Sequence, residues 1–445
     1  MRKLTLAWAC LFLAACLSCA IPTLPQKPAI DPALARQYFA EARKLSEADG
    51  GRLWGKPLYG PMLFADPGTS FVVASQADAE GRLKEQDGVF VGTLPPEVNV
   101  ANTATVWAGV KWTMVMWPLP SSPTARARLM MHELFHALQD SLGLPAASPA
   151  NAHLSMLEGR IWLQLEWRAL RQALARPEAP PAERKRAVED VLLFRLARRA
   201  LFPKAEAEER GLEMNEGLAE YTGYKLRGTA DAATAEVVIA RLGSAPDETS
   251  FSRSFAYASG PAYGMLLDLA GASWRKGLTP QSDFGELLRQ AYGISLPRDL
   301  SAAAAERAAI YDGVALRWSE TRQAEQRKAL ADSYRRRLLE GPVLILPVAE
   351  QFSFSFDPNA VIQLDDANAC YRTLRATDSW GVLEVSDGAL VVRGQSRFLH
   401  VAVQAPSDAT PRDGALEGPG WKLTLSSGWQ LAPGPRAGDH QLTRK

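Results

Sequence analysis

Residues 128–139 read RLMMHELFHALQ and contain the pentapeptide HELFH, whose residue types and spacing could hold a metal ion. On an α-helix, positions i and i+4 share a face, so His132 and His136 can direct two imidazole nitrogens toward one point. Glu133 would stand beside that point and could act as general base on a water molecule. The pattern predicts a catalytic zinc site. The alternative is a buried helix whose histidines are satisfied by ordinary hydrogen bonds.

Two features of the sequence favour zinc. The chain has only five histidines, so two of them at this spacing around a glutamate would seldom occur by chance. The neighbouring residues are uncharged, as expected for a helix buried in an enzyme core. They are Leu129, Met130, Met131, Leu134, Phe135, Ala137 and Leu138.

A catalytic zinc takes three protein ligands and keeps a fourth position open, so a third ligand is needed. The segment MNEGLAEY, residues 214–221, places Glu216 and Glu220 four residues apart on one helical face. Glu216 is the predicted ligand, and Glu220 is predicted to accept the outer N–H of a ligand histidine. Glu158, in LEGRIWLQLEW with Glu166 two turns further on, is the alternative third ligand.

HExxH followed on a later helix by NEG resembles the gluzincin metallopeptidases, the group that includes thermolysin and the aminopeptidase N family. The resemblance implies a zincin-like domain in which His132, His136 and Glu216 bind one Zn²⁺. It also implies that Glu133 is the general base, and it puts Glu220 where thermolysin-like enzymes carry an acid behind the ligands. The interval between His136 and Glu216 is much longer than in those families, which implies an insertion.

In the aminopeptidase branch, a YxxG segment downstream supplies a phenol that donates a hydrogen bond to the oxyanion of the tetrahedral intermediate. Residues 255–266 read FAYASGPAYGML, so Tyr257 with Gly260 resembles this segment, and Tyr263 is the competing tyrosine. A phenol suits the task because it donates one strong hydrogen bond while it stays neutral. The GxMEN segment that holds a substrate's amino terminus in aminopeptidases is absent, so an endopeptidase is expected.

The N-terminus predicts export. A short positive segment, MRK, precedes the apolar run LTLAWACLFLAA, which has the length of a signal peptide and is too short to span a bilayer. Leu13-Ala14-Ala15-Cys16 resembles the lipobox of bacterial lipoproteins, in which the cysteine carries the lipid; Cys19 fits less well, and an ordinary cleaved signal is the alternative. We therefore expect a protein of the bacterial cell envelope, anchored through Cys16 and facing the periplasm or the cell surface.

Composition limits the other functions. Lys and Arg total 50 against 49 Asp and Glu, so no overall field favours nucleic acid, and no nucleic-acid partner is expected. Three of the four cysteines lie in or beside the signal segment. Cys370 is left alone, and therefore no disulfide framework or cysteine metal site is implied.

The chain reads as an α+β protein. Residues 1–19 form the signal and lipobox, and 20–31 form a proline-rich tether. Residues 32–341 form the metallopeptidase domain: a helix over 32–47, strands between 52 and 117, a turn with a threonine cap, the HELFH helix, and helices to about 340. Residues 342–445 are short alternating strands, a β-rich C-terminal domain or extension.

The sequence therefore predicts a zinc-dependent peptidase in which Glu133 takes a proton from the attacking water and Tyr257 stabilises the oxyanion. The strand WTMVMWPLP is a candidate edge for an extended peptide substrate. Two alternatives stay open. One is an envelope-binding lipoprotein with a structural zinc, and the other is a zinc hydrolase of non-peptide amides or esters.

Overall fold

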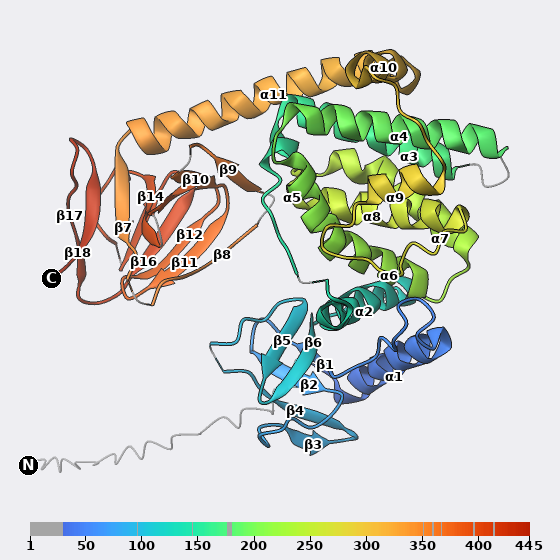
Figure 1. Cartoon of the computed structure of the whole chain (residues 1–445). Helices are drawn as coiled ribbons and strands as arrows, with labels where there is room; N and C mark the ends of the chain where they lie inside the picture. Colours follow the sequence, from blue (N-terminus) through green and yellow to red (C-terminus); the bar gives the residue numbers. More distant parts are fainter. Residues whose placement is uncertain are drawn as a thin grey trace, which may run out of the picture. The chain divides into compact units, whose positions relative to one another are not determined.

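The computed structural model describes residues 30–95, 97–144, 146–175, 180–349, 351–357, 360–365, 367–394, 397–412 and 414–445 (Figure 1). The lipobox with Cys16 and Cys19 and residues 20–29 of the tether lie outside these residues, so the lipid anchor stays a prediction. Within the described ranges, no helix is both long and apolar enough to cross a membrane.

The chain separates into two compact units. The first consists of the described residues up to Arg43 together with Gly60–Pro120, and the second of Lys44–Tyr59 together with Ser121–Lys445. The division falls inside helix α1 (Pro32–Asp49) and again just before the helix that carries HELFH. The predicted boundaries at residues 32 and 342 stay predictions.

The first unit is built on a six-stranded sheet in the order β3-β4-β2-β1-β6-β5. Its strands alternate with turns because apolar runs are separated by Gly, Pro and Asp. Phe39 of α1 stacks on Phe64 with 4.4 Å between ring centroids, while Trp112 and Met114 are fully buried in the core of the sheet. The strands are β1 (Met62–Ala65), β2 (Phe71–Ala74), β3 (Lys84–Gln86), β4 (Val89–Thr93), β5 (Thr103–Trp107) and β6 (Val110–Met116).

Strand β6 is an internal strand. It pairs in parallel with β1, where Thr113 lies opposite Met62, and antiparallel with β5, where Thr113 lies opposite Ala104. The expectation that this segment offers a free edge to a peptide is therefore wrong, because both of its hydrogen-bonding sides are occupied within the sheet.

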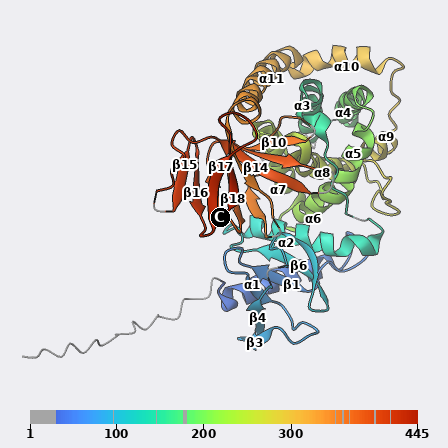
Figure 2. The ribbon, with the colours of Figure 1, turned by 90° about the vertical axis from the view of Figure 1, so that its left-hand side faces the viewer.

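Helices dominate the second unit up to residue 340, as the sequence predicted (Figure 1). They are α2 (Pro123–Leu138), α3 (Leu157–Leu174), α4 (Pro181–Leu201), α5 (Ala205–Leu212), α6 (Leu218–Leu226), α7 (Asp231–Ser244), α8 (Phe251–Leu269), α9 (Phe284–Ala291), α10 (Leu300–Ala308) and α11 (Gly313–Arg335). Helices α3 and α4 lie side by side as a long hairpin (Figures 1 and 2). Helices α3, α4 and α5 lie in the interval between the HELFH helix and Glu216.

The C-terminal part is rich in strands, as predicted, and the whole chain is of mixed α+β character. Its two sheets have the orders β17-β18-β7-β14-β13-β10-β9 and β15-β16-β12-β11-β8. Both sheets contribute buried side chains to one core that includes Trp380, Leu383 and Val401. The strands are β7 (Val343–Pro347), β8 (Ser353–Phe356), β9 (Val361–Gln363), β10 (Asn368–Tyr371), β11 (Leu374–Asp378), β12 (Gly381–Val385), β13 (Ala389–Arg393), β14 (Phe398–Gln404), β15 (Ala415–Gly418), β16 (Trp421–Leu425), β17 (Trp429–Pro433) and β18 (His440–Arg444).

Candidate metal centre

The HELFH segment occupies the second half of α2, and its two ligand candidates share a face. The helix begins at Pro123, whose missing N–H costs nothing in the first turn. Thr124 lies inside the helix and Ser122 at the N-cap makes no side-chain capping bond, so the expected threonine cap is wrong. Met131 and Phe135 are fully buried, which fixes the rotation of α2 and leaves His132 and Glu133 at 4% exposure each.

Glu216 lies on a π-helical turn, η3 (Glu213–Gly217), between α5 and α6. A π turn inserts one residue into the helical repeat, and such turns occur often at functional sites. Helix α6 packs along α2, and it carries Glu220 toward the back of His132. The turn and the helix packing thus bring two carboxylates of one segment to the HELFH face.

Three side-chain atoms converge between α2 and η3. Nε2 of His132 lies 3.0 Å from Nε2 of His136, and Oε2 of Glu216 lies 3.4 Å from the first nitrogen and 3.6 Å from the second. In a tetrahedral zinc site with bonds of about 2.0 to 2.2 Å, two ligand atoms are about 3.3 to 3.6 Å apart. The two carboxylate–histidine distances match this range, and the two nitrogens lie slightly closer, at 3.0 Å. The three residues form the one group of this kind in the described part of the chain.

The outer nitrogens of both histidines are held by hydrogen bonds. Nδ1 of His132 lies 2.9 Å from Oε2 of Glu220, and Nδ1 of His136 lies 2.5 Å from Oε1 of Gln139. A carboxylate and an amide carbonyl oxygen only accept hydrogen bonds, so each Nδ1 donates, and in the neutral ring Nε2 keeps a lone pair that could bind a cation. Glu220 is held in turn by Arg128, 2.5 Å away. This is how ligand histidines are usually oriented in metal sites.

Glu133 is buried without a compensating contact at one oxygen. Its Oε2 has no hydrogen-bond partner among the described residues. Burial raises the pKa of Glu133 above its usual range, although His132 and His136 act in the opposite direction. A buried carboxylate with an unused acceptor costs free energy, and a substrate-side water would satisfy it. The arrangement suits a group that accepts a proton.

The electrostatics of the ligands reflect their mutual contact. Burial would lower the pKa of His132, but its hydrogen bonds to Glu216 and Glu220 outweigh this and raise the pKa to about 10. Burial would raise the pKa of Glu216, but His132, His136 and Arg253 hold it well below its usual range. Positive charge on the histidines and on Arg253 therefore stabilises the Glu216 carboxylate. A divalent cation would supply positive charge to both histidine nitrogens and to the carboxylate oxygen at once.

Helix α8 contributes Tyr257 to the site. The Tyr257 hydroxyl donates a short hydrogen bond to Oε2 of Glu216, and the phenol ring stacks on the His132 ring with 5.6 Å between centroids. Burial and the neighbouring Glu216 raise the pKa of Tyr257, so the phenol keeps its proton. Tyr263 is fully buried and donates to Glu166 instead, 2.7 Å away. The structure thus brings Tyr257, and not its competitor, to the site.

Two glycines set the distance between η3 and α8. A Cβ atom on Gly260 would lie 2.4 Å from Cα of Gly217, and backbone atoms cannot move aside as a flexible side chain can. Gly217 belongs to the NEG segment and Gly260 to the YxxG segment. Their close approach allows the Tyr257 hydroxyl to reach Glu216.

Glu158 lies away from the converging atoms. Both of its carboxylate oxygens contact Arg317 of α11, with Oε2 accepting at 3.0 Å, and its side chain is 38% exposed. Arg317 holds the pKa of Glu158 below its usual range. The structure therefore places Glu216, and not the alternative Glu158, with the two histidines.

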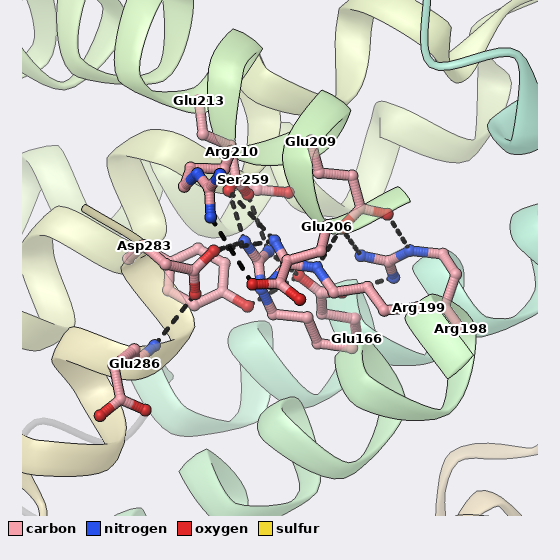
Figure 3. Close-up of polar contacts among 12 residues, drawn as sticks. Glu166, Arg198, Arg199, Glu206, Glu209, Arg210, Glu213, Ser259, Asp283 and Glu286 are labelled. Carbon is pink, nitrogen blue, oxygen red and sulfur yellow. Dashed lines mark hydrogen bonds and ion pairs between the residues drawn. The ribbon is translucent and has the colours of Figure 1, made fainter. Parts of the chain in front are cut away.

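The hairpin α3–α4 forms a buried ionic cluster behind η3 (Figure 3). Nε of Arg198 donates to Glu209 at 2.6 Å and its Nη1 donates to Glu166 at 2.5 Å; Nε of Arg199 also donates to Glu209, at 2.9 Å. His153 lies 2.8 Å from the same carboxylate. Burial would raise the pKa of Glu209, but these neighbours, Arg198 foremost, hold it well below its usual range. The cluster fixes α5, and with it the turn that carries Glu216.

Sequence reasoning missed three residues of the site. Arg128 lies one helical turn before His132, and Gln139 lies nearly one turn after His136. Arg253 lies one turn before Tyr257 and donates to Oε1 of Glu216 at 2.7 Å. The i, i+3 and i, i+4 neighbours of each motif residue were the available signal, because such positions share a helix face.

Comparisons with known proteins found no match to this chain. No protein-family model, no curated protein and no solved structure matches it. The site must therefore be interpreted from its own chemistry.

Proposed function

We propose that this protein is a zinc-dependent peptidase with a zincin-like catalytic domain. The observation that carries the proposal is the convergence of Nε2 of His132, Nε2 of His136 and Oε2 of Glu216 beside a buried Glu133 whose Oε2 has no partner in the described structure. These donors fit zinc, which binds imidazole nitrogen and carboxylate oxygen and leaves one position open in catalytic sites. When bound, zinc would polarise the substrate carbonyl and make water easier to deprotonate.

The chain's own residues have separable tasks in this proposal. Glu133 accepts the proton of the attacking water and returns it to the leaving amine. Tyr257 donates a hydrogen bond where negative charge develops on the carbonyl oxygen. Glu220 and Gln139 keep the histidine rings oriented so that both Nε2 atoms stay available.

A purely structural zinc would have no use for Glu133. Structural sites close their fourth position with another protein ligand, whereas here the neighbouring carboxylate is a base of raised pKa with a free acceptor. A zinc hydrolase of non-peptide amides or esters would use the same groups, and assays on both substrate types separate it from a peptidase. Placement in the cell envelope through Cys16 is part of the proposal and rests on the N-terminal sequence alone.

The test measures zinc per chain and cleavage of a mixed peptide pool, for the wild type, Glu133→Gln and the surface control Glu158→Gln. We expect one zinc per chain in all three proteins. Cleavage should fall about 10²- to 10⁴-fold in Glu133→Gln only, because loss of a general base costs that much. A wild type that binds zinc and cleaves small esters but no peptide would favour the second hydrolase class. A wild type without zinc would overturn the proposal.

A further inference from the structure

The guanidinium group of Arg253 is an exposed positive charge at the candidate site. Arg253 of α8 donates from Nη2 to Oε1 of Glu216 at 2.7 Å and from Nη1 to the Ser148 hydroxyl at 2.8 Å. The same Nη2 lies 3.4 Å from the Tyr257 hydroxyl. Despite these contacts, the Arg253 side chain is 56% exposed, whereas Glu216 is 5% exposed. The Arg253 side chain is therefore accessible to a ligand that lies beside Glu216.

With a divalent ion bound, the charged groups around Arg253 would carry a net positive charge. Ligand histidines are neutral, so a divalent ion with Arg128 and Arg253 outweighs the carboxylates of Glu133, Glu216 and Glu220 by one positive charge. Arg128 is already matched by Glu220, which it contacts at 2.5 Å. Arg253 shares Glu216 with the ion and would therefore be only partly neutralised. An exposed excess charge beside a reaction centre attracts and orients a ligand of opposite charge.

The guanidinium also has unused hydrogen-bonding capacity. Arginine carries five N–H donors in a planar fork, and its contacts with Glu216, Ser148 and Tyr257 use three of them. The remaining N–H groups, on Nε and Nη1, can each donate a charge-assisted hydrogen bond to a carboxylate. The contact to Ser148 holds the fork in place, so little side-chain freedom is lost when a ligand binds.

We propose that this site selects substrates with a carboxylate close to the scissile bond, and that Arg253 binds that carboxylate. This inference rests on the proposed peptidase function. Arg253 and Tyr257 are one helical turn apart on α8, about 5.4 Å, and they contact the two oxygens of the Glu216 carboxylate. Consecutive residues of a peptide are about 3.8 Å apart, so the carboxylate belongs to one of the first two residues beyond the reacting carbonyl. It is either the C-terminal α-carboxylate or an acidic side chain.

The experiment compares matched peptides on the zinc-loaded full chain. One pair ends in a free carboxylate or in an amide two residues after the scissile bond, and a second pair carries Glu or Gln next to it. The variants are Arg253→Gln, Arg253→Lys and the control Arg317→Gln. Arg317 is a suitable control because it is a similarly exposed arginine paired with a glutamate, Glu158, away from the site. The readout is the ratio of kcat/KM for the acidic and the neutral member of each pair.

We expect the wild type to prefer one acidic member by roughly 10- to 100-fold, the range of a hydrogen-bonded charge pair. The ratio should collapse in Arg253→Gln, recover in part in Arg253→Lys and stay at the wild-type value in Arg317→Gln. Preference within the first pair identifies the C-terminal carboxylate, and preference within the second identifies a side chain. A wild-type ratio near one in both pairs overturns the inference. So does a ratio that survives in Arg253→Gln while zinc content is unchanged.

A binding measurement separates this inference from the proposed function. Calorimetry on Glu133→Gln compares an acetylated dipeptide acid with its amide, with and without the additional change Arg253→Gln. Tighter binding of the acid that is lost with Arg253 supports the carboxylate site even if the wild type cleaves no peptide. Equal binding of acid and amide, together with equal binding of the Glu and Gln peptides of the second pair, overturns it even if the wild type proves to be a peptidase.

Discussion

Glu209 and Glu216 are two buried carboxylates on one continuous helical segment, and their surroundings differ in kind. Glu209 is surrounded by donors: Arg198, Arg199 and His153 all contact it, and its side chain is 0% exposed. Glu216 instead meets His132 and His136 with Oε2 directed between two Nε2 atoms. Donors within the protein surround the first carboxylate, whereas Oε2 of the second shares one point with two histidine nitrogens, where we propose that zinc binds. The difference separates a buried charge that stabilises a fold from one proposed to hold a ligand.

Removing the charge at Glu209 should have the largest effect on stability. In Glu209→Gln, the buried guanidinium groups of Arg198 and Arg199 lose their shared partner, and breaking a buried pair costs about 3 to 5 kcal/mol. Denaturant unfolding of the metal-free protein measures this free energy. An effect below about 1 kcal/mol would mean that the cluster relaxes easily.

The contribution of Glu209 to the free energy of unfolding should depend on pH. The pKa of Glu209 is lowered in the folded protein, so its contribution is complete above the ordinary carboxyl value of 4.5 and is lost as the pH falls below it. The difference in unfolding free energy between the wild type and Glu209→Gln should therefore shrink between about pH 4.5 and lower values. A difference that stays constant during acidification would contradict the charge-based explanation.

Glu216→Gln should give the opposite result. Zinc affinity should fall more than about 100-fold, because even the partners of ligand residues cost 10- to 100-fold when they are removed. The metal-free protein should lose less stability than Glu209→Gln does, because Arg253, the arginine paired with Glu216, is 56% exposed. Competition with a chelating dye measures the affinity, and Glu209→Gln is the control. Equal zinc binding by Glu216→Gln and wild type would remove Glu216 from the ligand set.

Gly260→Ala tests whether the backbone contact positions the site. The new Cβ would lie 2.4 Å from Cα of Gly217, so η3 and α8 must separate, at a cost of about 1 to 3 kcal/mol. Tyr257 should then lose its hydrogen bond to Glu216. We expect kcat to fall by a larger factor than zinc affinity does. Gly271→Ala is not a matched control, because the backbone φ of 69° at Gly271 would be strained with any other residue. Ala262→Gly on the same helix serves instead.

Glu158→Ala should have the smallest effect. Its partner Arg317 is half-exposed, and exposed ion pairs contribute about 0 to 1 kcal/mol. Zinc content and activity should equal those of the wild type. A variant that loses its zinc would restore Glu158 as the third ligand and overturn the structural placement.

The sequence predicted the parts of the site that are local in the chain. HELFH places two histidines and a glutamate on one helix face by geometry alone, and NEG places Glu216 and Glu220 on another. The sequence could not predict the placement of Glu158, which depends on how α11 reaches α3, or the contact of Arg253 with Glu216, which depends on the packing of α8. Both are contacts between distant segments, about which helical periodicity says nothing.

The fold shows the same limit. Apolar alternation predicted the strands later seen as β1, β2, β4 and β6, and missed β3 and β5, which are short or partly exposed. Because β5 was missed, β6 was expected at an edge. In the C-terminal part, the strands β9, β10, β11, β15 and β18 were missed for a similar reason: few residues and mixed polarity give no periodic signal.

The hairpin between HELFH and the π turn also has a consequence for the order of events during folding. His136 and Glu216 are about 80 positions apart in the chain, and that interval contains α3, α4 and α5. Bringing His136 and Glu216 together closes a long loop, which is slow and has an entropic cost. The loop closes only when the hairpin α3–α4 has packed against the other helices. The two histidines alone form a weak, incomplete chelate in the nascent chain. If the proposed site binds zinc, metal capture is therefore expected as a late step, and full zinc occupancy would report that the helical core has already assembled.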